Sequence, residues 1–230
     1  MRIGGFQKVS LIDFPGQISA VIFTQGCNFR CPYCHNPELV DPDLFKPPMD
    51  LGPILAYLDL RRGKIDGVTI TGGEPTLHAD LPELIRTTRE LGYRIKLDTN
   101  GARPEVLRRL LEEGPLDYIA MDLKAPLEKY PGATCSEVDP ESICESVNLV
   151  MSSGVDYEFR TTVLPSPTLE KDLLAMVQQI AGARRWVLQR FVPGRILAPN
   201  PALEHTLSEM EMRNLKEGFE KYVSHVMIRA

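Results

Sequence analysis

Short β-branched or apolar stretches alternate with longer amphipathic ones, and this alternation restricts the possible folds of the chain more than any other feature. Six stretches are predicted strands: residues 18–26, 67–73, 93–101, 116–124, 155–165 and 185–195. Six others are predicted helices: residues 50–64, 80–92, 103–114, 139–154, 168–182 and 206–222. Regular alternation of this kind builds a parallel sheet covered by helices. We therefore expect an α/β protein. Six strand–helix units suit a partial (β/α)6 barrel better than a closed eight-unit barrel, and the pattern alone leaves a doubly wound open sheet as an alternative.

Candidate capping residues precede several of the predicted helices. Asp50 and Asp80 stand directly before two of them, and Glu83 follows Asp80 at the spacing of a capping box variant. Ser208 and Glu211 have the same spacing at the start of the last helix. We expect side chain to backbone hydrogen bonds at these helix starts.

Length, charge and hydropathy limit the class of protein. The chain has 230 residues, which suits one domain over residues 1–230, and its net charge of −5 argues against a general nucleic-acid binder. No apolar run approaches the roughly 20 residues that span a membrane. The N-terminal segment lacks the apolar core of a signal peptide. We expect a cytoplasmic protein with reduced thiols and with neither nucleic acid nor a membrane as partner.

Polar residues follow or end each predicted strand. Since the carboxyl ends of parallel strands meet at one rim, where sites of such folds lie, we expect these residues to form a site. In chain order they are Gln25; Gly72, Gly73 and Glu74; Asp98, Thr99 and Asn100; Asp122 and Lys124; Glu158, Arg160 and Thr162; Gln189 and Arg190.

Three of the five cysteines lie in the segment GCNFRCPYCHNPE, residues 26–38. Cys27, Cys31 and Cys34 are soft ligands that suit an iron–sulfur cluster, for which four cysteines are usual. Three thiolates on a [4Fe–4S] cluster would leave one iron open for chemistry, as an open position does on catalytic zinc. The alternative is a structural zinc site that adds His35, but the adjacent Cys34 and His35 would then have to ligate one ion.

The spacing Cys-x3-Cys-x2-Cys, with Tyr33 before the last cysteine, resembles the signature of radical S-adenosylmethionine (SAM) enzymes. The segment GGEP at 72–75 is similar to the second motif of that superfamily. Together with LDTNG at 97–101 and DLK at 122–124, these motifs resemble those of glycyl-radical-enzyme activases. The opening IGGFQKVSLIDFPGQISAVIFTQGCNFRCPYCHNPELV most closely resembles the anaerobic ribonucleoside-triphosphate reductase activating proteins of similar length. The likeness covers essentially the whole chain and implies one domain of radical SAM type.

The resemblance implies a role for each motif. The three cysteines would ligate three irons of a [4Fe–4S] cluster, and the amino and carboxylate groups of SAM would chelate the fourth. Gly72 and Gly73 would let the backbone approach the methionyl part, since they lack a Cβ. Glu74 would accept hydrogen bonds from the methionyl amine, and Tyr33 would lie beside the adenine.

A monovalent cation is also implied by the resemblance. Asp98, Thr99 and Asp122 would help to hold it near the methionyl carboxylate, and hard oxygen ligands suit such an ion. Asn100 belongs to the same motif and to the predicted cofactor site. Lys124 or Arg160 would neutralise the same carboxylate.

Two further positions bear on the target of the enzyme. Asp13, in IDFPG, matches an aspartate that touches the target loop in related activases, although it could equally shape the turn before the Pro-Gly pair. Pyruvate formate-lyase activases carry a histidine after the sixth strand, where this chain has Gln189, Arg190 and Phe191. We take Gln189 as the candidate cofactor contact there, and the departure argues against pyruvate formate-lyase as the target.

The function implied by the resemblance is activation of a glycyl radical enzyme, most like anaerobic ribonucleotide reductase. An electron from a flavodoxin or ferredoxin would enter the cluster, and SAM would be cleaved to methionine and a 5′-deoxyadenosyl radical, which takes hydrogen from a glycine of the partner. One alternative is a radical SAM enzyme that acts on a small molecule such as a purine-like precursor. Another is an electron-transfer module, which would leave GGEP and LDTNG without a role. Cys135 and Cys144 are expected to be ordinary thiols.

Overall fold

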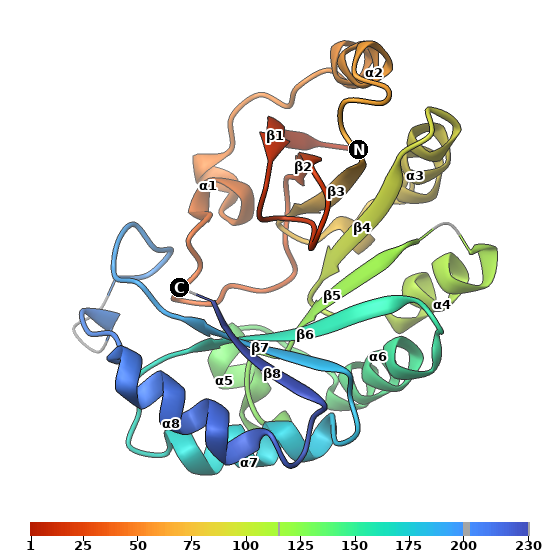
Figure 1. Cartoon of the computed structure of the whole chain (residues 1–230). Helices are drawn as coiled ribbons and strands as arrows, with labels where there is room; N and C mark the ends of the chain where they lie inside the picture. Colours follow the sequence, from red (N-terminus) through yellow and green to blue (C-terminus); the bar gives the residue numbers. More distant parts are fainter. Residues whose placement is uncertain (115, 200–202, 230) are drawn as a thin grey trace. The chain divides into compact units, whose positions relative to one another are not determined.

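The six apolar stretches form strands, and the six amphipathic stretches form helices (Figure 1). The structure is a computed structural model that describes residues 1–114, 116–199 and 203–229. The expected strands are β2 (Ser19–Thr24), β3 (Gly67–Gly72), β4 (Arg94–Thr99), β5 (Tyr118–Asp122), β6 (Asp156–Val163) and β7 (Arg185–Arg190). The expected helices are α2 (Leu51–Leu60), α3 (Leu81–Glu90), α4 (Pro104–Glu113), α6 (Pro140–Ser152), α7 (Leu169–Gln179) and α8 (Glu209–Phe219). The α/β class with parallel strands is confirmed.

Several elements of the described chain were not expected from the pattern. They are the strands β1 (Ile3–Ser10) and β8 (His225–Arg229), the helices α1 (Pro37–Val40) and α5 (Tyr130–Thr134), and the 3-10 helices η1 (Pro42–Leu44), η2 (Pro75–Leu77) and η3 (Leu127–Lys129). Strand β1 pairs with β2 in antiparallel orientation. This antiparallel strand lies outside the six strands that were expected.

Helix starts follow the capping prediction in one case and depart from it in two. Ser208 and Glu211 form a full capping box at the start of α8. Asp50 and Asp80 precede α2 and α3, but neither side chain caps its helix. The Asp80 carboxylate instead pairs with the N-terminal amine of Met1. Its backbone, with ψ of 8°, also departs from the extended conformation that a capping residue adopts.

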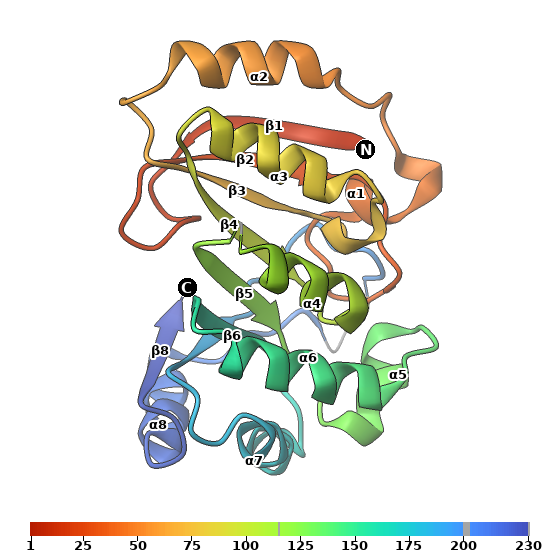
Figure 2. The same ribbon diagram turned by 90° about the vertical axis from the view of Figure 1, so that its right-hand side faces the viewer.

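The described residues group into two compact units, and the first comprises residues 1–28, 36–99 and 103–119. Within it, β2 pairs with β3 and β3 with β4, both in parallel. Helix α3 packs against β4 (Figure 2). Val21, Ile70 and Leu97 on the strands and Leu84 and Leu110 on the helices are buried, so the apolar strand faces and helix stripes form the core of this unit.

The second unit comprises residues 29–35, 100–102 and 120–230. Strands β6, β7 and β8 pair in that order, in parallel, and α8 packs against β7 and β8. Trp186 of β7 lies fully buried in this core, where its indole N–H donates to Thr161 Oγ1 at 3.0 Å and its ring meets Phe219 edge-on. A single domain over residues 1–230 stays a prediction.

The helices of the described chain are all too short or too polar to cross a membrane.

Candidate cluster and cofactor site

The cysteine loop starts in the first unit, at a sharp bend after β2. Gly26 adopts a φ of +109°, a conformation that favours glycine. Its N–H donates to Leu39 O at 2.7 Å, and its carbonyl accepts from Glu74 N–H at 2.8 Å. The residue before Cys27 is therefore fixed directly to the GGEP segment.

Gly72 and Gly73 admit a close approach of chain segments. A Cβ on Gly72, whose φ is +123°, would lie 2.3 Å from Thr24 N and O, and one on Gly73 would lie 2.0 Å from Gly26 O. No side chain fits at either position without moving backbone. The structure thus gives these glycines a packing role against the start of the cysteine loop, while the predicted approach to the methionyl group stays a prediction.

Glu74 is buried, with 1% of its surface exposed, and its Oε1 is fixed by three donors. Thr76 N–H donates at 3.1 Å, Thr76 Oγ1 at 2.6 Å and Thr99 Oγ1 at 2.8 Å. The first of these bonds makes Glu74 the capping residue of η2. A carboxylate held in this way is preorganised and suits the binding of a ligand ammonium group.

Cys31 and Cys34 lie in the second unit, joined by a tight turn in which Cys34 N–H donates to Cys31 O at 3.0 Å. Backbone bonds anchor the loop on both sides of this turn. Arg30 N–H donates to Thr134 O at 2.7 Å, and Leu197 N–H donates to Cys34 O at 3.0 Å. The two thiols therefore lie on a loop whose backbone is held by distant segments of the same unit.

His35 is exposed, and it contacts the segment that follows β7. Its Nε2 lies 2.9 Å from Val192 O, and its ring lies against Phe191 with centroids 5.3 Å apart. Among the described residues, no group of three or more His, Cys, Asp or Glu side chains could hold a metal ion. Ligation by the three cysteines stays a prediction.

The surroundings of Cys31 act on the pKa of its thiol in both directions, and the net effect raises that pKa. Burial raises the pKa of the Cys31 thiol, and the nearby Lys124 ammonium acts in the opposite direction. Tyr33 is buried beside it, and burial together with the Cys31 charge raises the pKa of its hydroxyl. Since the thiolate is the metal ligand, the Lys124 charge and the hydrogen bond from Tyr33, which both lower the pKa of Cys31, are the features here that fit a cluster.

The charged residues at the end of β4 pair within the chain. Lys96 is buried, and its ammonium contacts Asp98 Oδ1. Asn100, in the second unit, accepts a bond from Ala102 N–H at 3.0 Å and so shapes the turn after the strand. Lys96 was not among the predicted site residues.

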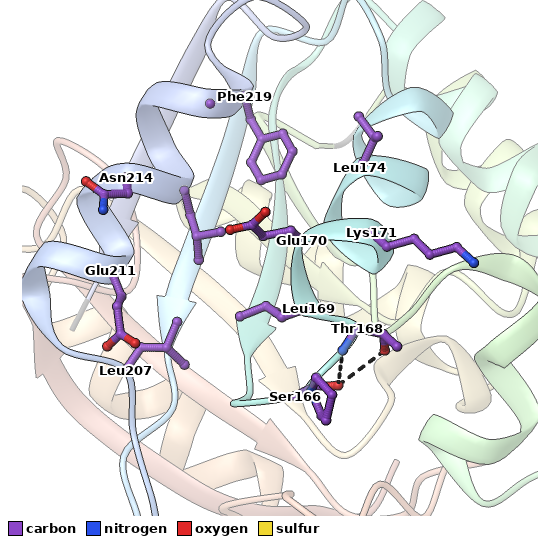
Figure 3. A pocket seen from close by; sticks show the side chains of 13 residues that line it. Ser166, Thr168, Leu169, Glu170, Lys171, Leu174, Leu207, Glu211, Asn214 and Phe219 are labelled. Atoms are coloured by element: carbon purple, nitrogen blue, oxygen red, sulfur yellow. Dashed lines mark hydrogen bonds between the residues drawn. The ribbon is translucent and has the colours of Figure 1, made fainter.

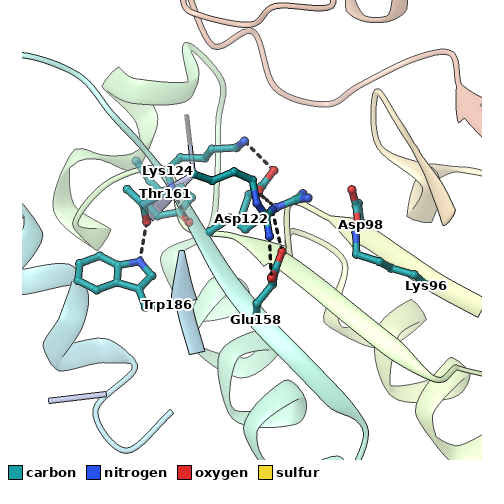
Figure 4. A network of polar contacts seen from close by, with 10 residues as sticks. Lys96, Asp98, Asp122, Lys124, Glu158, Thr161 and Trp186 are labelled. Atoms are coloured by element: carbon teal, nitrogen blue, oxygen red, sulfur yellow. Dashed lines mark hydrogen bonds and ion pairs between the residues drawn. The ribbon is translucent and has the colours of Figure 1, made fainter. Parts of the chain in front are cut away.

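Asp122 and Lys124 lie together in the second unit (Figure 4), and Arg160 also contacts Asp122 there. Arg160 Nε donates to Asp122 Oδ1 at 2.8 Å, and Lys124 Nζ donates to Asp122 Oδ2 at 2.9 Å. Burial acts to raise the pKa of Asp122, but the two cations outweigh it and hold that pKa well below its usual range. For Lys124, burial acts to lower the pKa, but the negative charges of Asp122, Tyr33 and Cys31 outweigh it. The pKa of Lys124 is therefore raised well above its usual value.

A second ion pair in this unit was not expected from the sequence. Glu158 (Figure 4) is buried on β6, and its carboxylate accepts two bonds from Arg229 of β8, at 3.1 and 3.2 Å. Gln189 lies half-buried on β7, in register with Thr162 of β6 and with Arg229 of β8. Its position on the strand is as predicted, and its contact with a cofactor stays a prediction.

Asp13 lies in the first unit, in the turn between β1 and β2. Ser10 Oγ donates to its carboxylate, and Asp13 N–H donates back to Ser10 Oγ at 3.2 Å. The neighbouring side chains of Leu11 and Ile12 are 74% and 80% exposed. The turn-shaping role of Asp13 is therefore present, beside an exposed apolar tip.

A cavity of about 830 Å³ lies between α7 and α8 (Figure 3). Leu169, Leu174 and Phe219 line it together with Glu170 and Glu211. None of the predicted site residues lies among the described residues that line it, and the motifs described above give the stronger indication of the site.

Comparison with known proteins identifies the family. The model of the Radical SAM superfamily matches residues 21–178. This span holds the three motif cysteines, GGEP, and the group of Asp122, Lys124 and Arg160, which we call the Asp122 cluster. A Methanocaldococcus jannaschii protein provisionally named a glycyl-radical enzyme activating enzyme, MJ1227, is 33% identical over 99% of this chain and 95% of its own length. The pyruvate formate-lyase-activating enzyme of Clostridium pasteurianum is 27% identical, and the match covers 98% of each chain.

A solved structure supports the fold. Streptococcus suis SuiB bound to S-adenosylmethionine matches 91% of this chain with a TM-score of 0.69 at 14% identity. The match covers 50% of SuiB, so this chain spans about half of that protein. Members of the family use a [4Fe–4S] cluster and SAM, which confirms these two predicted cofactors, while the monovalent cation stays a prediction. The chain belongs to the Radical SAM superfamily, and its relatives include glycyl-radical enzyme activating enzymes.

Proposed function

We propose that this chain activates a glycyl radical enzyme, and that its target is anaerobic ribonucleotide reductase. The observation that carries the proposal is the extent of the similarity to activating enzymes, which runs along 99% and 98% of the chain in two relatives. The aligned span therefore includes the positions of every motif of the candidate site, from the cysteine loop to Arg160.

In this proposal Cys27, Cys31 and Cys34 hold the cluster. The bound cluster and SAM supply the one-electron chemistry that removes a hydrogen atom from the Cα of a glycine. The chain itself positions the cluster and SAM. The bond from Glu74 N–H to Gly26 O ties the loop of Cys27 to GGEP, and the backbone bonds of the second unit hold the turn of Cys31 and Cys34.

Glu74 and the Asp122 cluster bind the two charged ends of the methionyl group. The Glu74 carboxylate accepts from the ammonium, because it is buried and already fixed by Thr76 and Thr99. Lys124 and Arg160 face the carboxylate, since a single Asp122 leaves one net positive charge in this cluster. Charge-assisted hydrogen bonds of this kind are stronger than neutral ones.

The choice of ribonucleotide reductase rests on two features of the sequence. Residues 3–40 resemble the activating proteins of that enzyme, and the end of β7 has Gln189 and Arg190, followed by Phe191, instead of histidine. Phe191 is fully buried against His35, so this segment supports the cysteine loop. The proposal also includes a flavodoxin or ferredoxin as electron donor and a cytoplasmic location, where thiols stay reduced.

Asp13 and the exposed Leu11 and Ile12 are the proposed contact with the partner. The two apolar side chains are mostly exposed, and they directly precede Asp13 in the turn that connects β1 with β2. Exposed apolar residues beside a polar anchor are typical of protein–protein contacts. Asp13→Ala should reduce activation of the partner and leave SAM cleavage without partner unchanged.

The fate of the glycine hydrogen tests the function. Anaerobic ribonucleotide reductase would be produced with glycine deuterated at Cα and mixed with the reconstituted chain, SAM and a chemical reductant. The proposal predicts one deuterium in the 5′-deoxyadenosine product, measured by mass spectrometry. Unlabelled product in the presence of this partner, together with turnover of a purine-like small molecule, would support the other kind of radical SAM enzyme instead.

A further inference from the structure

Lys96 is a buried lysine in the middle of a strand. It lies on β4 between the buried Ile95 and Leu97, and only 2% of its surface is exposed. Lysine is rarely buried to this degree without a partner, because removing an ammonium group from water is costly. A residue in this position therefore needs a negative charge beside it.

That charge comes from Asp98. Residues two positions apart on a strand project from the same face, and the Lys96 ammonium contacts Asp98 Oδ1. The Asp98 side chain is 11% exposed, so the pair is shielded from solvent on both sides. Asp98 is also the first of the residues that the family resemblance assigned to a monovalent cation.

The other two residues of that assignment also have partners within the chain. Thr99 Oγ1, in the first unit, donates to Glu74 Oε1 at 2.8 Å. Asp122, in the second unit, has Arg160 on one oxygen and Lys124 on the other. The two carboxylates expected to bind a cation are thus each paired with a side-chain cation of their own unit.

An ammonium and a monovalent metal ion offer a carboxylate the same charge in compact form. Both cannot favourably occupy the same side of one buried carboxylate, since like charges repel strongly where water is excluded. The residues present at Asp98 therefore do not fit a cation site of the kind the resemblance implies. Lys96 accounts for the charge that such an ion would supply.

We propose that the Lys96 ammonium takes the place of a monovalent cation at Asp98, and that this chain consequently binds SAM without Na⁺ or K⁺. The second half of the proposal rests on the proposed function, because it assumes that the GGEP and LDTNG segments form the SAM site. Lys96 is then a positioning residue that acts through Asp98.

One experiment needs no SAM, and its wild-type arm needs no variant. Crystals of the full chain would be soaked in Tl⁺, a heavy monovalent ion that mimics K⁺, and its sites located by anomalous scattering. The proposal predicts no Tl⁺ beside Asp98 in the wild type and a Tl⁺ site there in Lys96→Met, where the carboxylate has lost its cation. Tl⁺ bound at Asp98 of the wild type would overturn it.

A second experiment measures the affinity of the reconstituted chain for SAM by equilibrium dialysis, in tetramethylammonium, Na⁺ or K⁺ chloride at equal ionic strength. The wild type should bind with the same affinity in all three, within about twofold. Lys96→Met should lose about 10- to 100-fold in tetramethylammonium, the effect of one charge-assisted bond, and regain affinity in Na⁺ or K⁺. Lys64→Met, at an exposed lysine, should behave as the wild type does.

Each other result has a definite meaning. A wild type that needs Na⁺ or K⁺, or a Lys96→Met variant that binds equally well in every salt, contradicts the role of Lys96. If Lys96→Met does not fold, the wild-type arms of the two experiments decide the question. The double variant Lys96→Met with Asp98→Asn removes both charges, so it should fold and should bind no Tl⁺. Absence of SAM binding in every salt would contradict the proposed function, while the Tl⁺ sites would still test Lys96.

Discussion

Gly73 has no space for a side chain, because a Cβ there would lie 2.0 Å from Gly26 O and 3.0 Å from Leu39 O. Gly73→Ala should lower the free energy of unfolding by about 1–3 kcal/mol, the usual cost of overpacking, and impair assembly of the cluster. Urea unfolding and iron content measure the two effects. Gly218→Ala is the matched control: its Cβ meets nothing within 4 Å on helix α8, so it should raise stability by about 0.5–1 kcal/mol. Equal behaviour of the two variants would contradict the packing role of Gly73.

Glu74→Gln separates the binding role of this carboxylate from its capping role. The amide oxygen of glutamine can still accept from Thr76, so the local structure should survive. The loss of charge should weaken SAM binding by roughly 10- to 100-fold while the cluster assembles normally. Dialysis with labelled SAM and iron analysis check this, with Glu105→Gln on the exposed face of α4 as control. Reduced stability with unchanged affinity would leave Glu74 only its capping role.

Single residues differ in how well the sequence predicts them. Asp122, Lys124 and Arg160 were predicted for one site, and the structure brings them together, because each ends or follows a strand with a strong apolar pattern. Lys96 was missed, since a lysine in a strand ordinarily faces water. Only the packing around β4 shows that its ammonium is buried against Asp98.

At the level of elements, periodicity predicts the long segments and fails for the short ones. Strands β2 to β7 have consecutive buried residues and were expected. Strand β1 contains Gly4 and Gly5 and is mostly half-exposed, so its pattern does not resemble a strand. Helix α5 contains Pro131 and Gly132, which are typical of turns. Its structure depends on tertiary contacts, including the bond from Arg30 N–H to Thr134 O, which no local pattern contains.

The Asp122 cluster connects β5 with β6 and should make stability depend on pH. Its pKa is lowered in the folded chain, because Arg160 and Lys124 outweigh the effect of burial. The carboxylate therefore stabilises the fold fully above its ordinary pKa of 3.8, and this contribution is lost as the pH falls below that value. Asp122→Asn removes the carboxylate that both cations contact and should cost about 3–5 kcal/mol near neutral pH.

Urea unfolding at neutral and acidic pH measures this contribution. The difference in unfolding free energy between wild type and Asp122→Asn should shrink as the pH falls below 3.8. Asp156→Asn, which breaks an exposed pair with Arg184 near the start of β6, should cost less than about 1 kcal/mol. A difference for Asp122→Asn that stays constant with pH would show that its charge does not act as described.

For the whole molecule, the iron content tests the cluster. Anaerobically reconstituted protein should bind about four irons per chain. Cys27→Ala, Cys31→Ala or Cys34→Ala should abolish both the cluster and SAM cleavage. Cys135→Ala, at an exposed position, and Cys144→Ala should leave both intact. A complete cluster after the loss of Cys31 would contradict the ligand assignment.

The central claim, that this chain generates a radical on a glycine of a partner enzyme, is tested most directly by electron paramagnetic resonance. Anaerobic ribonucleotide reductase would be mixed with the reconstituted chain, SAM and reductant, and with the Cys31→Ala variant as control. The account predicts a glycyl radical signal that requires both SAM and intact Cys31. No glycyl radical signal on this partner, although the same preparation cleaves SAM, would contradict the choice of target, and failure with every glycyl radical enzyme offered would contradict activation itself.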